Sequence, residues 1–172
     1  MSTTAVPAVE GWFTTDAEPH LLGTRCTTCG TVFFPKASGF CRNPECRGRE
    51  FDEVELSRTG KVWSYTDAQY QPPPPYIPPA GEHEPFALAA VELAEEQVVV
   101  LGQVAKGYGV GDLSVGATVE LVVEPLYEAD GVDHLIYRWK PLTSAFPGNA
   151  GREATPPPGG SGARPSPGGE QS

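Results

Sequence analysis

The sequence of 172 residues has no stretch that approaches the roughly 20 consecutive apolar residues of a membrane-spanning helix. Its N-terminus also lacks a basic segment followed by an apolar core, which is the pattern of a secretory signal. These two absences predict a cytoplasmic protein without a membrane span. In that reducing compartment stable disulfides are uncommon.

Basic residues are scarce, because 12 Lys and Arg stand against 22 Asp and Glu and give a formal net charge of −10. The deficit is uneven: residues 21–51 carry a net charge of +3, whereas residues 52–146 carry −10. Phosphates dominate the affinity of nucleic acids for proteins. The strongly acidic charge of this chain therefore disfavours nucleic acid as a partner. Three arginines of the basic segment, Arg42, Arg47 and Arg49, are candidates for contact with a smaller anionic ligand.

Familiar catalytic motifs are also lacking. The histidines His20, His83 and His134 lie far apart, and the sequence contains no HExxH, GxSxG or P-loop pattern. The GYGVG stretch at residues 107–111 misses the GxGxxG spacing, and it lacks the βαβ context of a dinucleotide site. The sequence therefore predicts no catalytic residue and no enzyme that is active alone.

What the sequence does contain is a cluster of cysteines. All four lie in RCTTCGTVFFPKASGFCRNPECRG, residues 25–48, as Cys26-x2-Cys29 and Cys41-x4-Cys46 separated by 11 residues. Two close pairs on a short arm suit tetrahedral zinc, and four sulfur ligands leave no open position, so the predicted role is structural. Two disulfides or a redox pair are the less favoured interpretations, and a rubredoxin-type iron site stays open.

The rest of the chain alternates apolar and polar residues with a period of two, which is typical of β-strands. Such strands are predicted at residues 54–58, 61–70, 86–93, 97–105, 118–126 and 134–140, with a helical turn at 112–116. This count favours a mainly β fold with a small closed barrel of the OB type.

Four regions are expected along the chain. An N-terminal arm, short and helical or irregular, spans residues 1–20, with Trp12 and Phe13 as packing anchors. A rubredoxin-like zinc ribbon spans 21–51, and the OB-fold barrel spans 52–146. The segment 147–172 has no Val, Ile, Leu or aromatic residue, so a disordered Pro/Gly-rich tail is predicted.

A proline-rich segment interrupts the predicted barrel between its second and third strands. Residues 71–84 read QPPPPYIPPAGEHE, and consecutive prolines favour a stiff extended rod. Two interpretations are equally weighted: a rigid long loop, or an arm that contacts a partner or ligand.

The chain resembles the acyl-CoA-associated OB-fold family, which joins an N-terminal arm, a rubredoxin-like zinc ribbon and a C-terminal OB-fold. The resemblance covers about residues 9–142 and rests on the following stretches: CTTCGTVFFP, CRNPEC, GKVWSYT, PFALAAVELAEEQVVVLGQV and VGATVELVVEPLYEADGVDHLIYRWKP.

The resemblance implies an accessory subunit that forms a hetero-oligomer with a thiolase-like or sterol-carrier-type enzyme of acyl-CoA metabolism, for example in steroid side-chain degradation. Catalytic residues would then belong to the partner. The family's metal ligands correspond to Cys26, Cys29, Cys41 and Cys46, with Zn²⁺ as the cofactor and a CoA thioester shared with the partner.

Two functional hypotheses of different classes follow. In the first, a non-catalytic subunit supports a CoA-thioester enzyme, and Arg42, Arg47 and Arg49 contact the phosphates of CoA; docking against an acidic partner face or plain solvation would also explain these arginines. In the second, an OB-fold protein binds single-stranded nucleic acid. The aromatic residues available for base stacking are Trp63, Tyr65, Tyr137 and Trp139.

Overall fold

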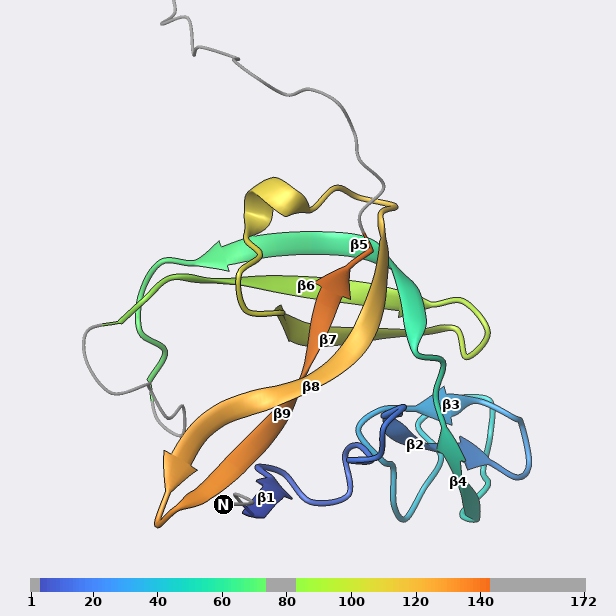
Figure 1. Ribbon diagram of the computed structural model, residues 1–172. Coiled ribbons are helices and arrows are strands. Elements are labelled where there is room, and N and C mark those ends of the chain that lie inside the picture. The colour runs from blue at the N-terminus through green and yellow to red at the C-terminus, as the bar shows by residue number, and fades with distance from the viewer. Residues whose placement is uncertain (1–3, 74–82, 143–172) are drawn as a thin grey trace, which may run out of the picture.

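The computed structural model describes residues 4–73 and 83–142 (Figure 1). Most of the predicted proline rod and the whole of the predicted tail at 147–172 lie outside these residues. In the described ranges the elements are β1 (Thr4–Pro7), β2 (Leu22–Cys26), β3 (Val32–Phe33), β4 (Phe51–Glu55), β5 (Thr59–Ala68), β6 (Phe86–Leu93), β7 (Val98–Val104), the 3-10 turn η1 (Val110–Asp112), β8 (Thr118–Ala129) and β9 (Val132–Pro141). The predicted mainly β fold is confirmed.

Strands β5 to β9 close into a barrel. β5 pairs with β6 and β8, β6 with β7, and β8 with β9, all antiparallel, while a short parallel pairing of β7 with β9 completes the circle. With η1 between β7 and β8, this is the predicted OB-fold. No helix in the described ranges has the length and apolarity to cross a membrane.

Inward-facing and outward-facing residues alternate along the strands. The inward-facing side chains are mostly small or branched and surround one large side chain, that of Trp139. Trp139 of β9 is fully buried, and Gly102 of β7 lies against it. A Cβ at Gly102 would stand 2.9 Å from atoms of both Trp139 and Tyr137. Glycine is therefore required where β7 passes the two aromatic rings.

The cysteine-containing segment forms a separate small sheet in the order β3-β2-β4. Here the structure corrects the prediction that residues 54–58 open the barrel. β4 pairs with β2, with Cys26 opposite Phe51 and Leu22 opposite Glu55, and so belongs to the ribbon. A period-two pattern indicates a strand but does not say which sheet it joins.

The N-terminal arm differs from the predicted short helix. β1 runs parallel to β9, and residues 8–20 form turns and bends. Of the two predictions for this arm, helical or irregular, the irregular one is correct for residues 8–20. Gly11 adopts φ +74°, and the backbone of Phe13 bridges to Leu21, which an α-helix would not allow. The arm is held by long-range pairing rather than by local helical bonds.

Aromatic side chains join the arm, the ribbon and the barrel. Phe13 of the arm and Phe34 of the ribbon both make edge-on contacts with Tyr137 of β9, and Trp12 meets Phe34 in the same way. Trp12 and Phe13 are thus packing anchors, as predicted. Leu21 and Leu56, which flank the ribbon, share one continuous core with the barrel residues.

Beyond the barrel, β8 and β9 continue as a long hairpin with β1 at its side (Figure 1). Asp130 and Gly131 turn the chain at its tip, both with positive φ. Near the tip, the rings of Tyr127 and His134 stack with centroids 4.5 Å apart.

Candidate metal centre

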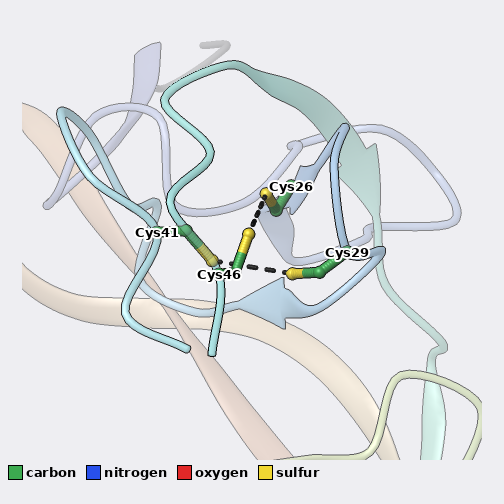
Figure 2. Close-up of side chains that lie close together, drawn as sticks. All are labelled: Cys26, Cys29, Cys41 and Cys46. Carbon is green, nitrogen blue, oxygen red and sulfur yellow. Dashed lines mark hydrogen bonds between the residues drawn. The ribbon is translucent and has the colours of Figure 1, made fainter. Parts of the chain in front are cut away.

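The four cysteine sulfurs converge at one end of the ribbon (Figure 2). All lie within 4.8 Å of one another, with 3.8 Å between Cys26 and Cys46 and 3.6 Å between Cys29 and Cys41. Zinc–sulfur bonds of about 2.3 Å in a regular tetrahedron place the sulfurs about 3.8 Å apart. The four thiols therefore fit a single zinc ion, in keeping with a zinc ribbon.

The first pair lies on a knuckle at the end of β2. Gly30 adopts φ +75°, and its amide donates to the carbonyl of Cys26 at 2.9 Å. The Cys26 amide donates in turn to the carbonyl of Thr31 at 3.0 Å. This turn brings Cys29 back over Cys26, and glycine supplies the left-handed conformation that the reversal needs.

The second pair lies on a loop that Asn43 organises. Its side-chain oxygen accepts from the Glu45 amide at 3.1 Å, and its carbonyl accepts from the Cys46 amide at 2.9 Å. The amide of Cys41 donates to the carbonyl of Gly48 at 2.9 Å, which closes the loop. Such an Asx turn is typical of an Asn-Pro pair, and Asn43 is a residue of this site that the sequence analysis did not predict.

Gly48 is a second residue that the sequence reasoning missed. A Cβ at this position would stand 2.9 Å from the Cys26 sulfur and 2.7 Å from the Thr28 hydroxyl. The Gly48 amide also donates to the Cys46 sulfur at 3.3 Å. The residue therefore leaves room for one sulfur and supports another.

The surroundings of the sulfurs favour thiolates at one knuckle. The backbone amide of Cys29 is the main cause that lowers the pKa of Cys26, and the Thr31 hydroxyl lowers the pKa of Cys29 to about 6. Burial raises the pKa of Cys41 to about 12. A divalent cation would supply the charge that converts such a buried thiol into a thiolate.

The arrangement argues against the disulfide interpretation. All four cysteines are free thiols, and the sulfur–sulfur distances of 3.8 Å for Cys26–Cys46 and 3.6 Å for Cys29–Cys41 far exceed the roughly 2.05 Å of a disulfide bond. With four sulfurs around it, a bound zinc ion has no open position for water or substrate. Its chemistry is then to hold the two knuckles together.

The three candidate arginines of the basic segment all lie exposed in or beside the second knuckle. The guanidinium of Arg49 sits 4.2 Å above the ring centroid of Phe40, which is itself exposed. Arg42 and Arg47 lie on either side of Cys46 in the sequence. Phe40 was not predicted as part of this surface, because its contact with Arg49 follows from the closure of the loop.

The histidines take separate places with local contacts. His20 Nδ1 lies 3.0 Å from the carbonyl of Leu56, and His83 Nε2 lies 3.1 Å from that of Ala68. His134 stacks on Tyr127. Among the described residues, the four cysteines are the one group of metal-ligating side chains that converge.

Comparison with known families places both parts of the chain. Residues 16–52 match the ChsH2 rubredoxin-like zinc ribbon domain, and residues 53–124 match the ChsH2 C-terminal OB-fold domain.

Characterised relatives and one solved structure resemble most of the chain. A DUF35 domain-containing scaffold protein of Methanocaldococcus jannaschii is 36% identical over 71% of this chain and 82% of its own length. The benzoylsuccinyl-CoA thiolase subunit BbsA of Thauera aromatica is 33% identical over 72% of this chain and 78% of its own. A chain of an aldolase described as Ltp2-ChsH2(DUF35) superposes with a TM-score of 0.53 at 26% identity, covering 72% of this chain and 86% of that one.

Proposed function

The chain belongs to the ChsH2 (DUF35) family of zinc-ribbon and OB-fold proteins, and we propose that it is a non-catalytic accessory subunit of a thiolase-like enzyme. Support comes from relatives that are named as a thiolase subunit, a scaffold protein and part of an aldolase. The proposed substrates of the complex are acyl-CoA thioesters, and the proposed setting is steroid side-chain or related acyl-CoA degradation in the cytoplasm.

The observation that carries this proposal is the closed sulfur cluster. Cys26, Cys29, Cys41 and Cys46 are the proposed zinc ligands, and their sulfurs lie within 4.8 Å of one another, which suits the four-sulfur coordination of tetrahedral zinc. The thiols of the chain are thereby committed to the metal and are not available as nucleophiles. The chemistry of thioester cleavage or carbon–carbon bond cleavage is then left to the partner.

The direct test uses the purified chain with and without a thiolase-like subunit from the same organism. Alone, the chain should turn over no acyl-CoA thioester. Co-expressed, the two should copurify, and the complex should turn over more substrate than the thiolase-like subunit alone. Turnover by the isolated chain, or failure of every acyl-CoA enzyme of the organism to bind it, would contradict the proposal.

A finer part of the proposal concerns CoA itself. Arg42, Arg47 and Arg49 are proposed to meet the pyrophosphate and ribose phosphate of CoA, since guanidinium forks match phosphate oxygens. Their exposure on the only net-positive segment of an acidic chain supports this assignment. The triple change to Gln should raise the KM of the complex for its CoA thioester with little change in kcat.

A matched control for the arginines is Arg25→Gln, an exposed arginine on β2 of the same ribbon. It should leave KM unchanged. If the triple variant keeps the complex intact and KM does not move, the three arginines do not bind CoA. If the triple variant no longer forms the complex, the three arginines contact the partner subunit instead.

The nucleic-acid alternative loses two of its four stacking candidates, because Tyr137 and Trp139 are buried in the core. Trp63 and Tyr65 of β5 remain exposed, but the net charge of residues 52–146 opposes a polyanion. A salt-sensitive gel shift with single-stranded DNA would reveal such binding, and we expect none at physiological ionic strength.

A further inference from the structure

The outer surface of strands β5, β6 and β7 exposes large apolar side chains. Trp63 is 63% exposed, Leu101 60% and Val99 45%. Strand register places them together: Ala90 of β6 lies opposite Leu101 on one side and Ser64 on the other, and Trp63 is the extra residue at the bulge beside Ser64. The inward-facing alternate residues of β6 and β7 fill the barrel, so these side chains have no role in its core.

This surface, which we call the β5–β6–β7 face, is defined by Trp63, Leu88, Ala90, Val99 and Leu101. It is almost free of charge in a chain that is otherwise strongly acidic. β7 has no charged residue at all, and the outward charges Lys61 and Glu92 lie opposite each other, so they balance. An apolar centre without net charge and with an aromatic residue is the composition of a protein–protein interface core.

The edge of β7 gives a second reason to expect a cover. β9 pairs with β7 only at Gln103 and Val104, so within the described chain Val98–Gly102 have a strand neighbour on the β6 side alone. On the open side the Tyr137 hydroxyl donates to the Leu101 carbonyl at 2.8 Å. Uncovered edges usually carry a charge or a proline against unwanted pairing, and β7 has neither.

We propose that the β5–β6–β7 face is the surface on which the thiolase-like subunit docks, through an uncharged apolar patch of that subunit. The inference rests on the proposed function, and it locates the contact on the barrel. Charge selects this occupant over two others. Nucleic acid and an anionic membrane surface both need cations, and the five residues of the face include none. Lys61 beside the face lies opposite Glu92, which offsets its charge.

The test measures binding of the purified thiolase-like subunit to three single variants of the full chain: Trp63→Lys, Leu101→Lys and Val115→Lys. Val115 is 70% exposed in the loop before β8, outside the face, and is the matched control. Each of the first two variants should raise the Kd for the thiolase-like subunit at least about tenfold, as changes at interface hot spots do. The control should raise it less than about twofold. All three should keep the wild-type zinc content and unfolding temperature, because the replaced side chains lie outside the core.

Hydrogen exchange on the wild-type complex gives an answer that depends on no variant. Amides of Val98–Gly102 should exchange at least about tenfold more slowly in the complex than in the free chain. A complex that forms with unchanged affinity in both face variants, or without protection of β7, overturns the docking face and leaves the proposed function intact. A free wild-type dimer that Leu101→Lys dissociates assigns the face to a second copy and also overturns it. If no thiolase-like subunit binds the wild type, the proposed function itself fails.

Discussion

The ribbon and the barrel are stabilised by different means. The ribbon sheet has strands of five, two and five residues and two fully buried leucines, Leu21 and Leu56, at its base. The barrel has strands of seven to twelve residues around the fully buried Trp139. A sheet as small as the ribbon cannot offset its ordering entropy by apolar burial alone, so it depends on its metal.

The two parts are nevertheless not independent. Phe13, Phe34 and Tyr137 join them edge to edge, and Leu21 and Leu56 belong to the same core as the barrel residues. We therefore expect damage to the ribbon to uncover one end of the barrel, and damage inside the barrel to leave the cysteine knuckles in place. The difference between the parts can be tested by changes that act on one of them at a time.

The largest effect should come from removal of the metal. Structural zinc sites contribute about 10 kcal/mol or more, so chelation or Cys41→Ser should unfold residues 21–56. Hydrogen exchange should show loss of protection in β2 and β4, while β6 and β8 stay protected. Elemental analysis of the wild type should find about one zinc per chain. Loss of protection in both sheets together would show that the barrel has no stability of its own.

The converse experiment empties the barrel core. Trp139→Ala removes its largest fully buried side chain and should lower the free energy of unfolding by about 3–5 kcal/mol. Zinc content should stay the same, because the ribbon cysteines are untouched. The exposed Trp63 is the matched control, and Trp63→Ala should change unfolding by less than about 0.5 kcal/mol in chemical denaturation of the uncomplexed chain.

A smaller effect is expected where β7 passes the aromatic rings. Gly102→Ala would place a methyl group 2.9 Å from Trp139 and Tyr137, and such overpacking costs about 1–3 kcal/mol. At Gly109 a Cβ would meet nothing within 4 Å, so Gly109→Ala should be neutral or slightly stabilising. Thermal unfolding of the two variants compares them directly, and equal melting temperatures would contradict the close approach.

The features that the sequence predicts are those with local causes. The convergence of the two cysteine pairs and the strand at residues 86–93 each depend on neighbouring residues, and the structure has both. The OB-fold followed from the number and order of the strands and from the family resemblance.

The features that sequence reasoning missed depend on residues far apart in the chain. The assignment of β4 to the ribbon depends on its pairing with β2, more than 20 residues earlier in the sequence. β1 forms only because β9, at the other end of the described chain, offers it an edge. Gly48 must be glycine because Cys26 and Thr28 approach it, which requires both knuckles to be in place. Such pairings leave no periodic trace within a short window of sequence.

The smallest expected effect lies where the ribbon and the barrel meet. Tyr137→Phe removes the hydrogen bond to the Leu101 carbonyl and should cost about 0.5–1.5 kcal/mol. Burial raises the pKa of Tyr137 from 10.0 to about 12, so the folded state favours the neutral phenol. The contribution of the neutral Tyr137 phenol to the free energy of unfolding is fully present below pH 10 and is lost as pH rises from 10 towards 12.

Urea titrations of the wild type and Tyr137→Phe between pH 8 and pH 12 measure this contribution. The wild type should lose more stability than the variant over the upper two units, because only the wild type has a phenol to ionise there. Parallel curves for the two proteins would show that Tyr137 does not titrate with folding. The zinc content of both should be equal at pH 8.

The position of β9 at the end of the described chain has a consequence for biosynthesis. β9 is the strand to which β1, β7 and β8 all pair, and it supplies Tyr137 and Trp139. On the ribosome we expect the knuckles to take up metal early, because all four proposed zinc ligands have emerged once residue 46 has. β1, the first strand of the described residues, must by contrast wait for β9, the last of them. Contacts so distant in sequence are costly to close, so we expect the nascent chain to pass through a stage with a metal-bound ribbon beside an open, apolar sheet.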